Sequence, residues 1–352
     1  MKNTAYRNWR TAWRCVCYLF AITVLVSACV QPTVKEPLFI IDKESLTDMD
    51  KESLLVIRVA GKNFEQVVLG LSEELTDDFF LHELIVDKTT KKHQIASKIK
   101  KVSPKIVVLM DNISINLYKG YQKGLPQSVS IIPSVSVMAS FMDMAIKNLE
   151  NATGIFYEVP LVTSVVNLRA ILSSNSFDKV GVVHREFMYP AISFNQNYCV
   201  REDVELITYS IPNKGNIQSE LKTALNKLGK EVNAFWIPND NRLINAELFN
   251  SIWIPFAKEF QKPIITGVES LIAPKFKFGT FAVIPDPVQL GTQAAEIVFE
   301  AMDNDWEVET GEVEPPRSVY KIINLEQAEG LFKVNKEKLQ NMVDKILTGS
   351  KT

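Results

Sequence analysis

The sequence is poor in the residues that build metal and redox sites. It has three histidines and four cysteines in 352 residues, and the histidines stand far apart. Spacings such as H-E-x-x-H or C-x-x-C, which are typical of zinc and redox sites, do not occur. We therefore expect no metal and no other cofactor. Cys199 is the one cysteine outside the first 29 residues, and we interpret it as a small apolar core residue.

An excess of charge of one sign is also lacking. Lysine and arginine number 39 against 41 acidic residues, and each dense lysine cluster is short with acid nearby. Nucleic-acid binding needs a basic patch, so nucleic acid is not an expected partner. No nucleophile elbow, phosphate loop or paired acid–base motif occurs, and Gly61 and Gly70 do not form a dinucleotide fingerprint. We predict that the protein is not an enzyme and has no catalytic residue.

The apolar run near the N-terminus is too short to cross a membrane. Cys15 to Val26 spans twelve residues, whereas a membrane-spanning helix needs about 20. The segment before it carries four positive charges and no acid: Lys2, Arg7, Arg10 and Arg14. A positive segment followed by a short apolar run indicates a removable signal peptide. Its loss would lower the formal net charge from −2 to −6.

The apolar run ends in Val26-Ser27-Ala28-Cys29, which resembles a bacterial lipobox. The resemblance implies cleavage after residue 28 and lipidation of Cys29, so that residues 1–28 are the signal peptide and 29–52 a lipidated tether. Two or more acyl chains hold a protein stably at a membrane. The alternative is a plain secretory signal with a chance cysteine. Val30 stands where an aspartate would favour the inner membrane, so we favour the periplasmic side of the outer membrane.

From Leu54 onward, apolar runs typical of buried parallel strands alternate with helical periodicity. The pattern restarts after residue 155, which predicts an α/β protein with two Rossmann-like lobes, parallel sheets and a hinge cleft. We place the N-terminal lobe at 53–155, the C-terminal lobe at 156–275, a return to the N-terminal lobe at 276–302, and a C-terminal strand and helix at 303–352. We also expect a strand over 129–137 and a helix over 327–347. Asp286 before Pro287 predicts a helix start.

Short motifs stand in an order that is similar to one family. They include NATGI (151–155), DKVGVVH (178–184), AFWIPNDN (234–241), KPIITGVES (262–270), FGTFAVIPDPVQLGTQAAEI (278–297) and VYKIINLEQAEGL (319–331). Together they resemble the substrate-binding lipoproteins of ABC transporters of the tryptophan/tyrosine-uptake type. The resemblance implies the type I periplasmic-binding-protein fold and capture of a small molecule, often an aromatic amino acid, for an ABC permease. The segment 184–189 (HREFMY) departs from the family's pattern.

Ligands of open parallel sheets lie beyond the carboxyl ends of the strands. Polar residues follow the predicted strands at Asp111, Asn239, Asp240, Asn241, Glu269 and Ser270. An amino-acid ligand would need an anion for its ammonium group, for which we select Asp240. Its carboxylate would need hydroxyls, for which Ser136 and Ser140 are candidates.

Ring partners for an aromatic ligand are also near the strand ends. Phe187 is one candidate, whereas core packing is the favoured interpretation of Trp236. For the polar candidates the alternative is a turn or a helix cap, because aspartate, asparagine and serine favour both. Ser140 with Asp143 matches a capping box.

Two functions remain open from the sequence. The first is an ABC-importer binding protein that holds a small-molecule ligand and meets a permease. The second is an outer-membrane interaction or sensory lipoprotein that uses the same fold to bind a protein partner, such as a periplasmic sensor, without transport. Val30 and the departure at 184–189 favour the second.

Overall fold

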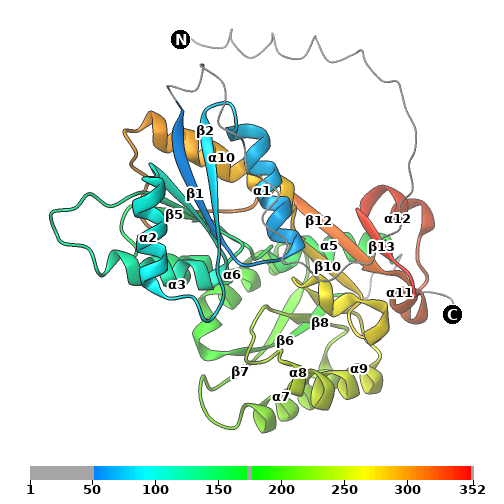
Figure 1. Ribbon diagram of the computed structural model, residues 1–352. Coiled ribbons are helices and arrows are strands. Elements are labelled where there is room, and N and C mark those ends of the chain that lie inside the picture. The colour runs from blue at the N-terminus through cyan, green and yellow to red at the C-terminus, as the bar shows by residue number, and fades with distance from the viewer. Residues whose placement is uncertain (1–50, 173–176, 350–352) are drawn as a thin grey trace, which may run out of the picture. The chain divides into compact units, whose positions relative to one another are not determined.

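The computed structural model describes residues 51–172 and 177–349, and these residues form two α/β lobes (Figure 1). The predicted signal peptide, Cys29 and nearly all of the predicted tether lie outside the described residues. Within the described part of the chain, no helix has both the length and the apolar character needed to span a bilayer.

The sheet of the first lobe is parallel throughout. Its strands lie in the order β11-β5-β4-β3-β1-β2. Their bounds are β1 Glu52–Arg58, β2 Phe79–Ile85, β3 Ile106–Met110, β4 Ser134–Val137, β5 Ala152–Ile155 and β11 Val313–Glu314. Both faces of the central strands are covered, which explains why the middle of β1 (residues 54–57) and the whole of β3 are continuous apolar runs in the sequence.

Helices cover the first sheet on both sides. One face packs against α1 Lys62–Leu75 and α10 Pro287–Asp303, and the other against α2 Lys92–Val102, α3 Asp111–Gln122 and α4 Met142–Ile146. Successive residues of β1 point to opposite faces, so that Leu54 joins the α1–α10 core and Leu55 joins the other.

The sheet of the second lobe has the order β13-β12-β10-β9-β8-β6-β7. All neighbours are parallel except β10 and β12. The bounds are β6 Lys179–Arg185, β7 Glu205–Ile211, β8 Ala234–Ile237, β9 Ile264–Thr266, β10 Phe281–Pro285, β12 Val319–Asn324 and β13 Lys345–Leu347. The opening β6-α6-β7-α7-β8 alternation follows the sequence prediction of a second α/β unit.

Helices also cover both faces of this sheet. One face carries α5 Leu161–Ile171, α6 Tyr189–Val200, α11 Leu325–Leu331 and α12 Lys336–Met342. The other carries α7 Ile217–Glu231, α8 Ala246–Leu248 and α9 Ile254–Phe260, with a π-helical turn at Phe249–Trp253. Three 3-10 turns lie at Glu186–Met188, Glu269–Ile272 and Pro274–Phe276.

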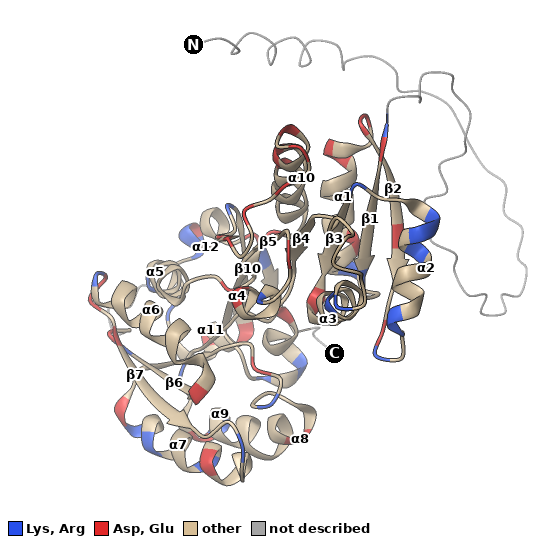
Figure 2. Ribbon diagram, turned by 90° about the vertical axis from the view of Figure 1, so that its left-hand side faces the viewer, with Lys and Arg blue, Asp and Glu red and all other residues tan. Residues whose placement is uncertain are grey.

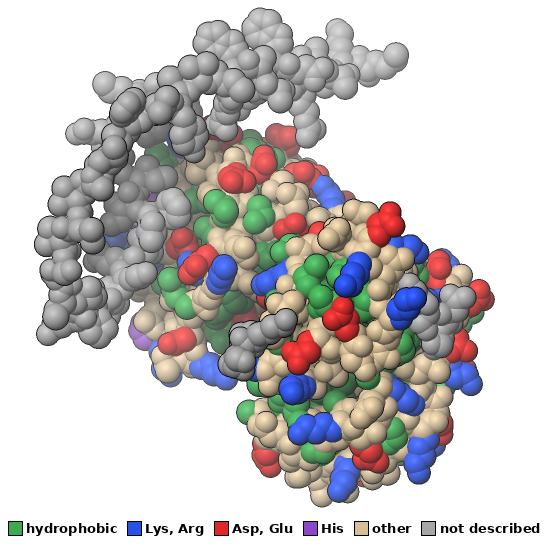
Figure 3. All heavy atoms as spheres, turned by 90° about the vertical axis from the view of Figure 1, so that its right-hand side faces the viewer, with side chains coloured by type: hydrophobic (Ala, Val, Ile, Leu, Met, Phe, Trp, Pro, Cys, Tyr) green, Lys and Arg blue, Asp and Glu red, His purple; other side chains and the backbone are tan. Residues whose placement is uncertain are grey.

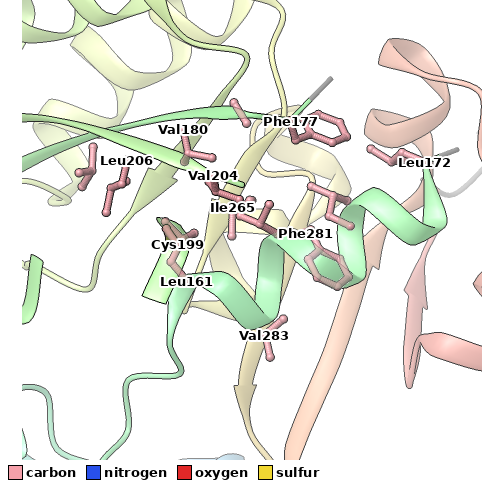
Figure 4. Packing of buried hydrophobic residues seen from close by; sticks show 14 of the residues in the cluster. Leu161, Leu172, Phe177, Val180, Cys199, Val204, Leu206, Ile265, Phe281 and Val283 are labelled. Atoms are coloured by element: carbon pink, nitrogen blue, oxygen red, sulfur yellow. The ribbon is translucent and has the colours of Figure 1, made fainter. Parts of the chain in front are cut away.

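The core under α5 is a cluster of buried hydrophobic side chains. Figure 4 shows Leu161 of α5 beside Cys199 of α6, with Val180, Ile265 and Phe281 of the sheet in the same cluster. Cys199 is fully buried, and its burial raises the pKa of the thiol to about 11. Cys199 is therefore a packed apolar side chain, as the sequence predicts.

The chain passes between the two sheets three times. It leaves the first sheet after β5, returns after β10 into α10, and crosses again between β11 and β12. The returning helix α10 lies directly on α1 (Figure 1). At the crossing of these helices, Gly70 and Gly291 bring the two backbones together: a Cβ on Gly291 would lie 2.1 Å from the carbonyl oxygen of Val67.

Three sequence predictions about elements need correction. The strand expected over 129–137 begins only at Ser134, because Pro133 before it has no N–H to donate to a ladder. The helix expected over 327–347 is instead α11, α12 and the strand β13. In the segment 276–302, β10 pairs with β9 of the second sheet, and the return to the first lobe begins with α10.

Charged residues lie mainly on the helices and loops of both lobes (Figure 2). On the face drawn in Figure 3, lysines and arginines are interspersed with acidic residues. The strand interiors carry few charges, and two arginines at strand ends, the buried Arg58 and the partly buried Arg185, are each held in an ion pair.

Candidate functional site

A cavity of about 440 Å³ lies where the two lobes and their connecting segments meet. We refer to it as the interlobe cavity. Most of its lining is apolar and aromatic. The lining residues are Phe141, Asp143, Phe156, Tyr157, Glu158, Val159, Pro160, Ser164, Met188, Pro190, Ala191, Phe194, Asn195, Trp236, Pro238, Asn239, Thr266, Gly267, Val283 and Pro315. A concave, mostly apolar site with a few polar groups is typical of small-molecule binding.

The first connecting segment, which follows β5, supplies two titratable groups of the interlobe cavity, Tyr157 and Glu158, and α4 supplies Asp143. Burial raises the pKa of the Glu158 carboxyl to about 7, and the nearby charge of Asp143 adds to the effect. Burial also raises the pKa of Tyr157 to about 12. Glu158 accepts a hydrogen bond of 2.9 Å from the N–H of Phe141, which ties this segment to the loop after β4.

The loop after β4 has an unusual backbone. Met138 and Phe141 have φ angles of 60° and 55°, in the left-handed region that bulky side chains rarely adopt. The loop is held by Asn112 of α3, whose amide donates to the carbonyl of Ser140 and accepts from its N–H, both at 3.0 Å. Strained loops that are held this firmly are often found at ligand sites.

Two contacts join the lobes beside the interlobe cavity. The side-chain amide of Asn239, at the end of β8, donates a hydrogen bond of 2.8 Å to the hydroxyl of Ser140. The rings of Phe141 and Phe187 meet edge to face with 5.2 Å between their centroids. The structure therefore brings together three of the predicted site residues, Ser140, Asn239 and Phe187. Ser140 does not cap α4, since its hydroxyl accepts from Asn239 instead.

Asp240 has a different environment from the one predicted. Its side chain is 2% exposed and accepts two hydrogen bonds from Arg185, at 2.6 and 2.9 Å, and a third from the N–H of Arg242. Arg185 also lies over the ring of Phe187 at 4.4 Å. The carboxylate of Asp240 is thus already paired with a cation of its own lobe, and Asp240 does not line the interlobe cavity.

The remaining predicted residues lie elsewhere. Ser136 is fully buried in β4, and its hydroxyl has no hydrogen-bond partner among the residues that the structure describes. Asp111 begins α3 and accepts from the N–H of Ile113, while Asn241 is exposed. Glu269 pairs with Lys345 at 2.6 Å and, with the exposed Ser270, borders a second hollow of about 410 Å³. These five residues line no part of the interlobe cavity.

The sequence prediction missed Asp143, Tyr157 and Glu158. The sequence prediction rests on polar residues that follow the strands within each lobe. Tyr157 and Glu158 instead belong to the segment that leaves the first lobe and connects it to the second. The sequence signal for them is a glutamate two residues before Pro160, in the segment between the two predicted lobes. Trp236, interpreted from the sequence as a core residue, is only partly buried and lines the interlobe cavity.

Within residues 51–172 and 177–349, no three histidine, cysteine, aspartate or glutamate side chains are grouped closely enough to hold a metal ion. This arrangement does not test whether the protein uses a metal or a cofactor, so both expectations stay predictions. The arrangement of the interlobe cavity can enclose an aromatic solute between rings and can offer it carboxylate groups.

No protein-family model matches the chain, and no curated protein matches it in sequence. Several solved structures share its fold. A substrate-binding protein with adhesive properties from Clostridium difficile, in a ligand-free, open structure, is 14% identical, with a TM-score of 0.58 over 85% of this chain and 100% of that one.

Two further structures share the fold with somewhat lower TM-scores. A conserved domain protein from Vibrio cholerae is 15% identical, with a TM-score of 0.53 over 84% of this chain and 99% of that one. An ABC domain in complex with L-Trp from Streptococcus pneumoniae is 15% identical, with a TM-score of 0.51 over 84% of this chain and 100% of that one. The chain thus has the type I periplasmic-binding-protein fold, with two α/β lobes and a cleft between them.

Proposed function

We propose that the protein is an extracytoplasmic solute-binding lipoprotein of an ABC importer, which captures a small aromatic molecule in the interlobe cavity. The observation that carries this proposal is the cavity itself: about 440 Å³, lined from both lobes by rings and by a few polar groups. The fold is shared with a solved substrate-binding protein and with an ABC domain that was solved in complex with L-Trp. Because one fold can serve several functions, solute capture is inferred from the lining of the cavity and not from the fold alone.

Thermal unfolding of soluble residues 30–352 against aromatic amino acids, aromatic amines and neutral aromatic metabolites tests the proposal. A ligand at about 100 times its dissociation constant adds about 2.7 kcal/mol to the free energy of unfolding, which raises the midpoint visibly. Replacement of Trp236 by alanine should abolish the shift, because the ring is part of the cavity wall. The absence of a shift across the whole panel would argue against solute capture.

The lipid anchor is a separate part of the proposal and rests on the sequence around Cys29. Cells that express the Cys29→Ser variant should accumulate a precursor that carries no acyl chain, whereas the natural protein should be of mature size and take up labelled fatty acid. Acylated, mature-sized protein from the variant would exclude Cys29 as the modified residue.

A second candidate function is favoured by Val30, which follows Cys29 in place of aspartate. A protein held at the outer membrane is far from an inner-membrane permease, so it would instead engage a protein partner, such as a periplasmic sensor. Fractionation of the two membranes separates the candidates: recovery with the inner membrane supports import, and recovery with the outer membrane supports the partner-binding role.

A further inference from the structure

The charged groups that line the interlobe cavity are all acidic. Glu158 from the connecting segment and Asp143 from α4 are part of its wall, and none of the lining residues is a lysine or an arginine. An α-amino acid carries a carboxylate as well as an ammonium group, and a buried carboxylate needs a cation or several N–H donors. The lining therefore suits an ammonium group better than it suits a carboxylate.

The buried arginines at the strand ends do not change this balance. Arg58, at the end of β1, pairs with Glu83 of β2, and its side chain is 7% exposed. Arg185, at the end of β6, is held by both oxygens of Asp240 and is covered by the ring of Phe187. Each guanidinium has a carboxylate partner in its own lobe. Neither arginine is among the residues that line the interlobe cavity, so the cavity wall offers a ligand carboxylate no guanidinium.

Aromatic side chains complete the environment of a cation. Phe156 and Tyr157 come from the connecting segment, Phe194 from α6 and Trp236 from β8, and all four line the interlobe cavity. The faces of aromatic rings attract organic ammonium ions, and tryptophan does so best. Rings with carboxylates at one side are suited to a flat apolar molecule that carries a single positive charge.

We propose that the solute of the interlobe cavity is an aromatic amine without a carboxylate, whose ammonium group pairs with Glu158 and with Asp143 beside it. This inference rests on the proposed solute-capture function and narrows its ligand class. Glu158 is fixed in place by the hydrogen bond from the N–H of Phe141, so the carboxylate is positioned before the ligand arrives.

Binding of such a cation should be linked to proton release. The charged and titratable groups around Glu158 are Asp143, Tyr157 next to it in the chain, and Glu269, which acts on Tyr157. Burial and Asp143 raise the pKa of Glu158 to about 7. An ammonium ion beside Glu158 stabilises the ionised carboxylate, so affinity for the amine should rise as the pH increases from about 6 to 8.

Isothermal titration calorimetry with three matched probes tests the inference: tryptamine, L-tryptophan and indole-3-propionic acid. They share the indole ring and carry an amine alone, both groups, or a carboxylate alone. We expect tryptamine to bind at least tenfold more tightly than L-tryptophan, and indole-3-propionic acid to bind least. We also expect Glu158→Gln to weaken tryptamine binding at least tenfold, since glutamine keeps the acceptor for the Phe141 N–H but loses the charge.

Other outcomes are equally decisive. Tighter binding of L-tryptophan than of tryptamine would overturn the amine assignment and leave solute capture standing. The amine assignment would also be overturned if another aromatic solute of the thermal panel binds while neither tryptamine nor phenethylamine does, and solute capture would again stand. If no compound of the panel binds, the proposed function fails together with the inference. If Glu158→Gln unfolds, Asp143→Asn at the exposed rim provides the charge test, with an expected loss of affinity for tryptamine but not for a neutral indole.

Discussion

Asp240 and Arg185 form a buried, bidentate ion pair whose side chains are 2% and 12% exposed. Loss of one member of such a pair leaves an uncompensated charge in a region of low polarity. The pair also places Arg185 over Phe187, whose ring meets Phe141 of the other lobe. Asp240 is thus linked to the lobe contact through a chain of side chains, although it does not line the interlobe cavity.

Asp240→Asn should therefore act on stability. We expect the free energy of unfolding, measured with urea at pH 7, to fall by about 3–5 kcal/mol. A matched control lies at the other end of β6, where Lys179 and Glu205 form an exposed pair at 3.8 Å. Glu205→Gln should cost about 1 kcal/mol or less, because exposed pairs contribute little. Equal effects of the two substitutions would contradict the role of burial.

Glu158 should make stability depend on pH. Its folded-state pKa of about 7 lies above the ordinary value of 4.5, so the folded protein holds the proton more tightly than the unfolded chain. The stability that Glu158 contributes is present in full below pH 4.5 and is lost as the pH rises through 7. The free energy of unfolding of Glu158→Gln, minus that of the natural protein, should increase over this window by at most about 1.4 kcal/mol per pH unit. A difference that does not vary with pH would refute the raised pKa.

At the scale of elements, the contact of α1 with α10 depends on two glycines. The backbones meet at Gly70 and Gly291, and a Cβ on either residue would lie within about 2 Å of a backbone oxygen of the other helix. Backbone atoms do not move aside as the end of a side chain can. Each of the two helices therefore has a glycine at the point of closest contact, although α1 and α10 are far apart in the sequence.

We expect Gly291→Ala to lower the free energy of unfolding by about 1–3 kcal/mol or more, through overpacking of the helix pair. Gly330 in α11 is the control, because a Cβ there meets no atom within 4 Å. Gly330→Ala should leave stability unchanged or raise it by up to about 1 kcal/mol, as alanine favours a helix. Chemical denaturation of both variants measures the effects, and a neutral Gly291→Ala would show that the helices can separate without loss.

Most elements were predictable because their apolar periodicity is strong. The alternation over β1, α1, β2 and α2 follows the expected pattern, and Asp286 caps α10 with Pro287 in its first turn, as predicted. The small elements of the C-terminal part were not predictable in this way. The strand β13 has three residues, too few to show a period, and its pairing with β12 is decided by tertiary contact.

At the scale of the whole molecule, the contacts of Phe141 with Phe187 and of Ser140 with Asn239 hold the lobes together. An edge-to-face ring pair contributes about 0.5–1.5 kcal/mol. Phe141→Ala should therefore shift the ratio of closed to open molecules toward the open form by about two- to tenfold. Small-angle X-ray scattering without ligand should show a larger radius of gyration than for Tyr189→Ala, whose ring is 64% exposed. Identical scattering curves would speak against a hinge controlled by Phe141.

The site was predictable only in part, because it is assembled from both lobes. The strand-end rule led to Asn239, which lines the interlobe cavity, and to Ser140, which accepts a hydrogen bond from Asn239, since parallel strands place their carboxyl ends at one edge. The pairing of Asp240 with Arg185 was not visible, because it joins two strands whose register the sequence does not specify. Glu158 and Tyr157 were missed because the role of a connecting segment depends on how the lobes are arranged around it.

The position of α10 in the chain also affects how the protein is made. Its apolar face covers α1, yet it is synthesised about 200 residues later. At a synthesis rate of about 5–20 residues per second, the apolar face of α1 waits for about 10–40 s. During that interval the core between α1 and the first sheet lacks the side chains that α10 supplies. For a protein that we propose to be exported, such a delay favours translocation, since a lobe without its complete core is less able to fold.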